Sequence, residues 1–196
     1  MKKYELTEES IQLFDRTLYR IKALIDIPSI NVKKGDLGGF VESERNLSQE
    51  GNCWMADEAI VFGEAKVFGA ARVFGEARVF GEAIVFGEAE VFGEAEVFGA
   101  ARVYEQARVF GEAEVFGEAL VTKTSDYLTI SPIGSENGVL TAFKDKEGKI
   151  FINRGCYTGT IEEFEQRVKE VHGENKYGLV YLNHLTTIKL QLRTEA

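Results

Sequence analysis

The central part of the chain alternates inward and outward positions with a strict six-residue period. Ten units of the form Val-Phe-Gly-Glu-Ala-x run without a gap from Val61 to Leu120, and Val121 begins another. Because six is even, an extended chain places the Val, Gly and Ala of every unit on one face, and the Phe, Glu and variable residue on the other. On a helix every sixth residue advances by about 600°, so the valines would form no stripe. The pattern therefore predicts β-strands.

The repeat also predicts how these strands are arranged. Strands usually run about 3 to 10 residues, so the chain must turn at each Gly-Glu pair rather than continue as one strand. Three strands and three corners give a narrow coil of about eighteen residues, and successive coils would stack about 4.8 Å apart by parallel pairing. We therefore expect a mainly β protein, a parallel β-helix of about four coils whose interior is packed by Val, Ala and Gly.

Two parts of the chain resemble known families. From Gln49 to Val121, an aliphatic residue is followed four positions later by a small one, which resembles the left-handed parallel β-helix of the hexapeptide-repeat superfamily. The left hand is implied by this resemblance. The segments 35–43 (GDLGGFVES), 47–54 (LSQEGNCW) and 155–164 (GCYTGTIEEF) resemble bacteriophage and prophage hexapeptide-repeat proteins, which implies an origin more than an activity.

The segments outside the repeats predict a three-part organisation. We expect an N-terminal cap segment at 1–48, the β-helix at 49–123, and a small α+β domain at 124–196. In the cap, 7–10 could open a helix while 18–27 favours strand, and the segment should cover the open edge of the first coil. In the last part we expect strands at 127–133, 139–144 and 149–153 and a helix from Thr160 to Gly173, whereas 177–192 fits helix or strand.

The outward aromatic residues are the main candidate for function. With about eighteen residues per coil they should form three columns, and a bare column would exceed the apolar area that soluble monomers usually expose. The first column contains Phe62, Phe80, Phe98 and Phe116; the second Phe68, Phe86 and Tyr104; the third Phe74, Phe92 and Phe110.

Two interpretations of these columns stay open. The terminal segments and a second copy of the chain could cover the rings, or one column, Phe62, Phe80, Phe98 and Phe116, could serve as a stacking ladder for bases or sugars. The second column has the most apolar and least acidic neighbours, so we expect it to form the surface for homo-dimers, homo-trimers or a protein partner. That surface comprises Lys66, Phe68, Ile84, Phe86, Arg102, Tyr104 and Leu120.

Charge narrows the possible partners. The chain carries 23 basic and 32 acidic residues, a net charge of −9, and most of the acidic excess lies in the repeats, so general nucleic-acid binding is not expected. Arg72, Glu90 and Arg108 alternate in sign and should pair across strands. The glutamates Glu76, Glu94 and Glu112 predict a solvated ridge; they could form at most a weak cation site, and we expect no metal.

The residues that could support catalysis are few. The best-known members of the superfamily are trimeric acyltransferases with a histidine base near a solenoid loop, whereas the two histidines here, His172 and His184, follow the repeats and no loop interrupts them. Cys156 and His172 could meet as nucleophile and base, but a capping role is more usual for such a histidine. Cys53 occupies an inward position and should be buried. We therefore expect neither an enzyme nor a cofactor.

These observations leave three classes of function. The first is a non-enzymatic, phage-derived assembly protein that self-associates through its aromatic faces and engages a host or viral partner, with evasion of host defence as one role. The second is a protein that sequesters a nucleotide or sugar, and the third an atypical acyltransferase. The start of the chain lacks the pattern of a signal peptide and no stretch is apolar enough to span a membrane, so we expect a cytoplasmic protein of the bacterial host cell.

Overall fold

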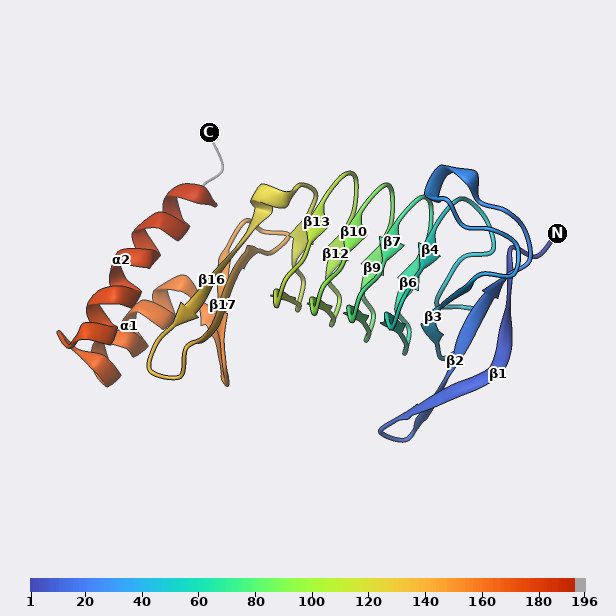
Figure 1. Ribbon diagram of the computed structural model, residues 1–196. Helices are drawn as coiled ribbons and strands as arrows, with labels where there is room; N and C mark the ends of the chain where they lie inside the picture. Colours follow the sequence, from blue (N-terminus) through green and yellow to red (C-terminus); the bar gives the residue numbers. More distant parts are fainter. Residues whose placement is uncertain (193–196) are drawn as a thin grey trace.

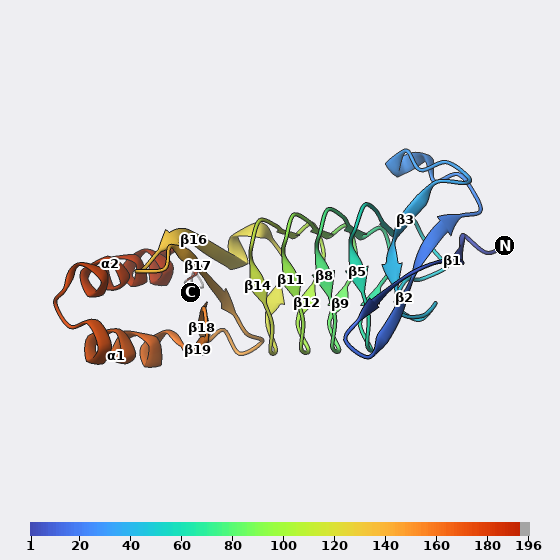
Figure 2. The ribbon, with the colours of Figure 1, turned by 60° about the horizontal axis from the view of Figure 1, so that its bottom comes forward.

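The computed structural model describes residues 1–192, which form three regions in a row (Figure 1). A β-hairpin lies at the N-terminal end, a solenoid of parallel coils forms the middle, and a sheet with two helices lies at the C-terminal end. The same order is visible after rotation, where the two helices lie side by side beyond the last coil (Figure 2).

The middle region is a left-handed parallel β-helix of about five turns, which confirms the predicted fold. Its strands are two residues long: β4 (Trp54–Met55), β5 (Ile60–Val61), β6 (Lys66–Val67), β7 (Arg72–Val73), β8 (Arg78–Val79), β9 (Ile84–Val85), β10 (Glu90–Val91), β11 (Glu96–Val97), β12 (Arg102–Val103), β13 (Arg108–Val109), β14 (Glu114–Val115) and β15 (Leu120–Val121). We call the sheet that contains β5, β8, β11 and β14 the first face, β6, β9, β12 and β15 the second face, and β4, β7, β10 and β13 the third face.

The parity of the repeat explains the interior. Every inward Val and Ala of the repeats is at most 1% exposed, and each Val lies beside the Val one coil away, as Val61 does with Val79. The glycines were also expected in the interior, but they lie at the corners of the coils instead. Gly63 occupies the corner at φ 70°, and a Cβ there would lie 3.3 Å from the backbone N and O of Gly81. The corner therefore needs glycine for its left-handed backbone and for the close approach of the next coil.

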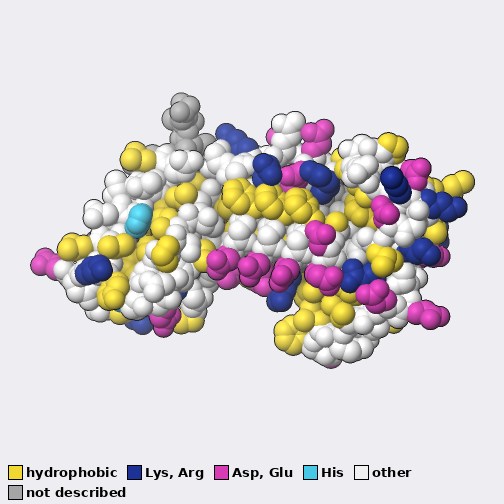
Figure 3. Space-filling model, in the orientation of Figure 1, with side chains coloured by type: hydrophobic (Ala, Val, Ile, Leu, Met, Phe, Trp, Pro, Cys, Tyr) yellow, Lys and Arg dark blue, Asp and Glu magenta, His cyan; other side chains and the backbone are white. Residues whose placement is uncertain are grey.

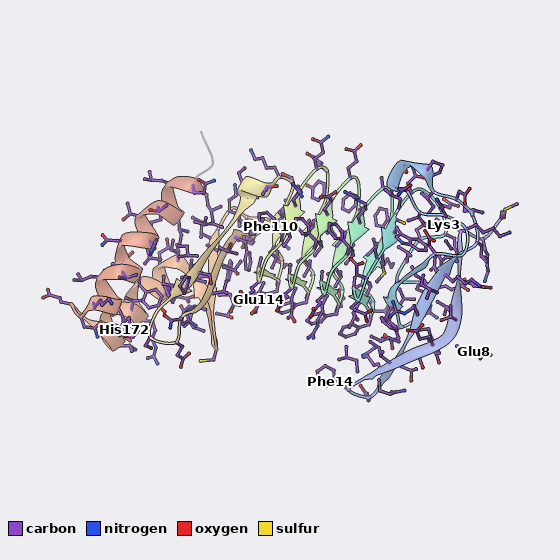
Figure 4. All side chains as sticks on the ribbon, in the orientation of Figure 1. Lys3, Glu8, Phe14, Phe110, Glu114 and His172 are labelled. Atoms are coloured by element: carbon purple, nitrogen blue, oxygen red, sulfur yellow. The ribbon has the colours of Figure 1, made fainter. Side chains whose placement is uncertain are left out.

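The N-terminal region is a continuation of the first face. β1 (Tyr4–Leu13) and β2 (Arg16–Ala23) form an antiparallel hairpin with the exposed Phe14 at its tip (Figure 4). A short 3-10 helix (Pro28–Ile30) precedes β3 (Leu37–Val41), which pairs antiparallel with β2 and parallel with β5. Parallel pairing with the coils thus begins at Phe40, within the segment expected to form the N-terminal cap.

The helix considered at 7–10 is instead part of β1. Its capping residues compete with strand pairing, and pairing prevails because the hairpin packs Ile11 and Leu13 of β1 against a buried cluster of Leu18, Phe40 and Ile60. The hairpin covers the open edge of the first face by hydrogen bonding to it, in agreement with the expected edge protection.

Lys3 and Tyr4 close the N-terminal end of the core. Lys3 is only 2% exposed, and its Nζ donates to the carbonyl of Cys53 at 2.8 Å and lies 3.1 Å from the Cys53 thiol. The Tyr4 hydroxyl donates to the carbonyl of Leu47 at 2.7 Å, and burial raises the pKa of this phenol. Cys53 is fully buried, as its inward position predicted.

The C-terminal region is a four-stranded antiparallel sheet with two helices. A 3-10 helix (Thr124–Asp126) leads into β16 (Tyr127–Ile133), β17 (Gly138–Lys144), β18 (Ile150–Arg154) and β19 (Tyr157–Thr160), which pair in sequence order, and then α1 (Ile161–His172) and α2 (Lys176–Gln191). β19 has no counterpart among the predicted strands.

Helix α1 begins and ends where the sequence predicted. Thr160 and Glu163 form the expected capping box, with backbone-to-side-chain bonds of 2.8 and 3.3 Å, and Gly173 caps the C-terminus. The ambiguous stretch 177–192 lies mainly in α2, because Tyr181, Leu185 and Ile188 share the face that packs in a core with β16–β18 and α1. Residues 193–196 lie outside the described part.

Candidate functional site

Each face of the solenoid presents two columns of outward side chains, one variable and one aromatic. In the aromatic columns, successive rings stack with centroids 4.7 to 5.3 Å apart and interplanar angles of at most 15°. The three predicted columns are therefore confirmed. Because coils repeat about every 4.8 Å, each ring face is in contact with the next ring, and only ring edges meet solvent along a column. A flat ligand could stack only at a column end.

Both ends of the first column are covered by the chain itself. Phe62 packs against the buried cluster of Leu18, Phe40 and Ile60, and the Arg16 guanidinium lies 5.8 Å from its ring centroid. At the other end, Phe116 meets the edge of Phe143 of β17 at 5.2 Å. The column considered as a possible stacking ladder, Phe62, Phe80, Phe98 and Phe116, therefore has protein side chains packed at both ends.

The C-terminal domain makes a second contact with the first face, through Glu114. Asn153 Nδ2 donates to Glu114 Oε2 at 2.6 Å, and the Glu114 backbone N donates to Thr141 Oγ1 at 3.1 Å (Figure 4). Burial raises the pKa of Glu114, the hydrogen bond from Asn153 opposes this shift, and the neighbouring Glu96 adds to it. Glu114 lies directly opposite Glu96 in the parallel pair of β11 and β14, and the sequence contained no signal for its contact with Asn153.

The charged side chains in the variable column of the third face pair with one another. Glu90 is paired with Arg72 in the coil before it, and its Oε2 lies 2.9 Å from Arg108 Nε in the coil after it, as the alternation of sign predicted. The two guanidinium groups also lie 5.6 and 5.0 Å from the ring centroids of Phe74 and Phe92. Figure 3 shows this row of hydrophobic side chains along the solenoid, bordered on one side by basic and acidic groups.

A row of acidic side chains borders the other side of the solenoid in Figure 3. The corner residues Glu76, Glu94 and Glu112 are exposed there. Within residues 1–192, no group of three or more His, Cys, Asp or Glu side chains is placed to hold a metal ion.

The second face differs from both. Its variable column is Lys66, Ile84, Arg102 and Leu120, in direct register, and within the described chain neither Lys66 nor Arg102 makes an ion pair. Phe68 is 38% exposed and Phe110 of the third column 42%, and the hydrophobic clusters formed with the terminal segments contain rings of the first column but none of the second or third. The residues that the sequence singled out are therefore brought together on one surface. The terminal segments meet this face at its two ends, where Leu47 pairs with Val67 and Ala119 with Asp145, but no ring of its aromatic column belongs to their hydrophobic clusters.

A cleft in the C-terminal domain brings together other chemically active residues. It has a volume of about 480 Å³ and lies between α1, α2 and the turns of the sheet. Cys156 and His172 both line it, but among residues 1–192 no hydrogen bond joins them, so the contact that a nucleophile–base pair requires is not made. Arg154 and Arg167 also line this cleft, and sequence reasoning missed both. His184 of α2 lies elsewhere.

Two further findings concern the chain as a whole. In the described residues, neither α1 nor α2 is long and apolar enough to span a membrane. No protein-family model matches the chain, and no curated protein matches it either.

Proposed function

We propose that the chain is a non-enzymatic binding or assembly protein that associates with itself through the second face. The observation that carries this proposal is a contrast between columns: the end rings of the first column, Phe62 and Phe116, pack in hydrophobic clusters with the terminal segments, whereas no ring of the second column does and Phe68 is 38% exposed. Uncovered contiguous apolar surface is typical of protein contacts, and stacked aromatic rings are rigid groups that lose little entropy when buried.

Charge also supports contact between two copies. The second face carries the cations Lys66 and Arg102 in its middle, while the corners beside it carry Glu64, Glu82 and Glu88. In a two-fold arrangement the same surface meets itself, so the cations of one copy can lie opposite the acidic corners of the other. A homo-dimer satisfies this complementarity directly, and a homo-trimer can satisfy it at each of its contacts.

The biological setting that we propose rests on the sequence resemblance. The segments 35–43 and 155–164 resemble phage and prophage hexapeptide-repeat proteins, which supports a phage-derived protein acting in the cytoplasm of a bacterial host. Such an assembly would engage a host or viral protein, and evasion of host defence is the role we propose for it.

The test of self-association compares two faces of the same solenoid. Phe68→Asp combined with Phe86→Asp should turn the assembly into a monomer, measured by size-exclusion chromatography with light scattering, because two carboxylates would be buried in the contact. The matched control is Phe74→Asp with Phe92→Asp on the third face, which should retain the assembly. A dimer or trimer that persists in a folded second-face variant would refute the proposal.

A gentler pair of changes guards against misfolding. Lys66 and Arg102 are exposed and make no ion pair in the described chain, so Lys66→Glu with Arg102→Glu should leave the fold intact. It should still weaken association at least about tenfold by placing acidic groups opposite acidic corners. Unchanged association of this variant would contradict the proposed surface.

A further inference from the structure

The cleft in the C-terminal domain has the size and shape of a small-molecule site. Its volume of about 480 Å³ falls within the range of about 300 to 1,000 Å³ that is common for ligand pockets. One wall is formed by the C-terminal half of α1, another by Tyr181 of α2, and the rim by the turn between β16 and β17 and the turn between β18 and β19. Helices α1 and α2, which line the cleft, lie at the far end of the molecule from the N-terminal hairpin (Figure 1).

Two arginines give the cleft a positive character in an acidic protein. Within residues 1–192 neither Arg154 nor Arg167 forms a salt bridge, although the chain has a net charge of −9. Arg154 donates through Nη2 to the carbonyl of Ile133 at 2.9 Å, but its Nε is buried and has no hydrogen-bond partner. Because this Nε is shielded from solvent, a ligand in the cleft can reach Arg154 only through its Nη atoms.

Acidic groups lie near both arginines, but none forms a salt bridge with them in the described chain. Arg154 also lines a second cavity with four glutamates of the solenoid, and Arg167 lies beside Glu163 and Glu170 on α1. Glu136 lies on the rim and is exposed, while Glu163 is engaged in the cap of α1. His172 adds a ring nitrogen that can donate a hydrogen bond. Guanidinium groups bind carboxylate and phosphate through two parallel hydrogen bonds, which makes an anion the complementary ligand.

The remaining wall is aromatic and aliphatic. The Phe164 ring lies 5.0 Å from Tyr157 and 5.5 Å from Tyr181, and the His172 ring lies 5.7 Å from Tyr181 at an angle of 30°. Val168 and Val171 of α1 complete this side. Aromatic walls favour flat ligands because offset-stacked and edge-to-face contacts add to the area that they bury.

We propose that this cleft binds a small molecule that carries an anionic group on a flat ring. Arg154 and Arg167 bind the anion, a phosphate or a carboxylate, and the ring packs against Tyr181 and its aromatic neighbours. The proposal requires no contact between copies of the chain, so it stands or falls separately from self-association through the second face.

The first test measures binding to the purified full-length chain by isothermal titration calorimetry. The probes are adenosine monophosphate, indole-3-acetate, uncharged adenosine and inorganic phosphate. We expect at least one ring-bearing anion to bind with one-to-one stoichiometry and a Kd below about 1 mM, and at least about tenfold more tightly than adenosine or phosphate. Preference for the nucleotide indicates a phosphate ligand, and preference for indole-3-acetate indicates a carboxylate.

The second test changes the cleft without disturbing the core. Arg167 is exposed on α1, so Arg167→Gln should preserve the fold and weaken the best probe at least about tenfold, whereas Arg167→Lys should weaken it less. Val171→Glu, at a position that is 55% exposed, should weaken it further by adding a negative charge. The matched control is Arg45→Gln, an exposed arginine at the other end of the chain, which should bind as the parent does.

Three results would overturn the assignment. One is that neither ring-bearing anion binds. Another is that uncharged adenosine binds at least as tightly as both adenosine monophosphate and indole-3-acetate. The last is that Arg167→Gln, shown by circular dichroism to be folded, binds the best probe with unchanged affinity.

Discussion

The second and third faces of the solenoid have the same backbone, the same corners and similar aromatic columns, yet they differ in what they leave for other molecules. On the third face the variable column alternates Arg72, Glu90 and Arg108, and these side chains pair with one another. On the second face the same positions hold Lys66, Ile84, Arg102 and Leu120, and the cations have no acidic neighbour in register. In a solenoid of this kind, the variable residue of each unit therefore determines whether the charged side chains of a face pair with one another or stay unpaired.

The reason is the register of the coils. Corresponding residues of successive coils lie directly opposite in the parallel sheets, so each column behaves as a series of cross-strand pairs worth about 0.2 to 1 kcal/mol each. A column whose charges alternate in sign forms these ion pairs within the chain. A sequence that mixes cations with aliphatic residues leaves both charge and apolar area for a partner.

The largest expected effect is a loss of stability on changing the buried valines, which both faces share. Val85 lies behind the second face and Val91 behind the third, and both are fully buried. Val85→Ala and Val91→Ala should each lower the free energy of unfolding by about 2 kcal/mol, because each removes buried methyl groups and leaves a small cavity. Urea denaturation of the two variants should give equal losses within about 0.5 kcal/mol. A clear inequality would mean that the faces differ inside as well as outside.

An intermediate effect is expected when the charge patterns of the two variable columns are exchanged. Glu90→Lys places three cations in one column of the third face and should cost about 1 to 2 kcal/mol, less at high salt, because two ion pairs are lost and like charges adjoin. Ile84→Glu does the reverse on the second face, since it creates the alternating pattern. It should raise monomer stability by a few tenths of a kcal/mol and weaken self-association at least about tenfold.

These two variants should be measured by urea denaturation at low and high salt and by light scattering. The matched control is Ile84→Lys, which introduces the same like-charge column as Glu90→Lys but breaks no ion pair. It should therefore cost less than Glu90→Lys. Equal costs would show that the ion pairs of the third face contribute nothing measurable.

The sequence predicted the solenoid because its information is local and repeated. Because the period is even, Val and Ala fall on the same face of an extended chain in every unit. Each repeat therefore gives the same prediction as the one before it. The glycines were misplaced because parity assigns each residue to a face of a strand, whereas Gly63 lies in a corner with φ 70°, where the alternation of a strand no longer applies.

The ends of the molecule were harder to predict because their information is not local. The residues at 7–10 carry a helix-capping pattern, but they lie in β1, which pairs with β2 on either side of them, and the sequence alone does not place β2 beside them. The C-terminal cleft joins Arg154 at the end of β18, Arg167 on α1 and Tyr181 on α2. Only the packing of α1 against the sheet and α2 brings these together. The one signal in the sequence that was overlooked is that Arg167 follows Phe164 by three residues and so shares its side of the helix.

The smallest expected effect concerns the first face, which is intermediate between the other two. Its variable column pairs Arg78 with Glu96 at 3.4 Å, but Glu96 then lies beside Glu114. Since burial raises the pKa of Glu114, the folded state holds the Glu114 proton more tightly than the unfolded chain does. This group therefore favours folding at low pH, and its contribution is lost as the pH rises through the raised pKa.

Glu114→Gln removes this titration and keeps an oxygen that can accept the hydrogen bond from Asn153. The variant should therefore be slightly more stable than the parent at pH 7, by less than about 1 kcal/mol because the side chain is partly solvated. The advantage should shrink as the pH falls toward 4, where Glu114 of the parent becomes protonated. Thermal unfolding of both chains between pH 4 and 7 measures the difference, and Glu112→Gln, at an exposed corner, is the control. An advantage that grows at low pH would mean that Glu114 is stabilised as a carboxylate, and that the first face tolerates like charges because the hydrogen bond from Asn153 outweighs both burial and Glu96.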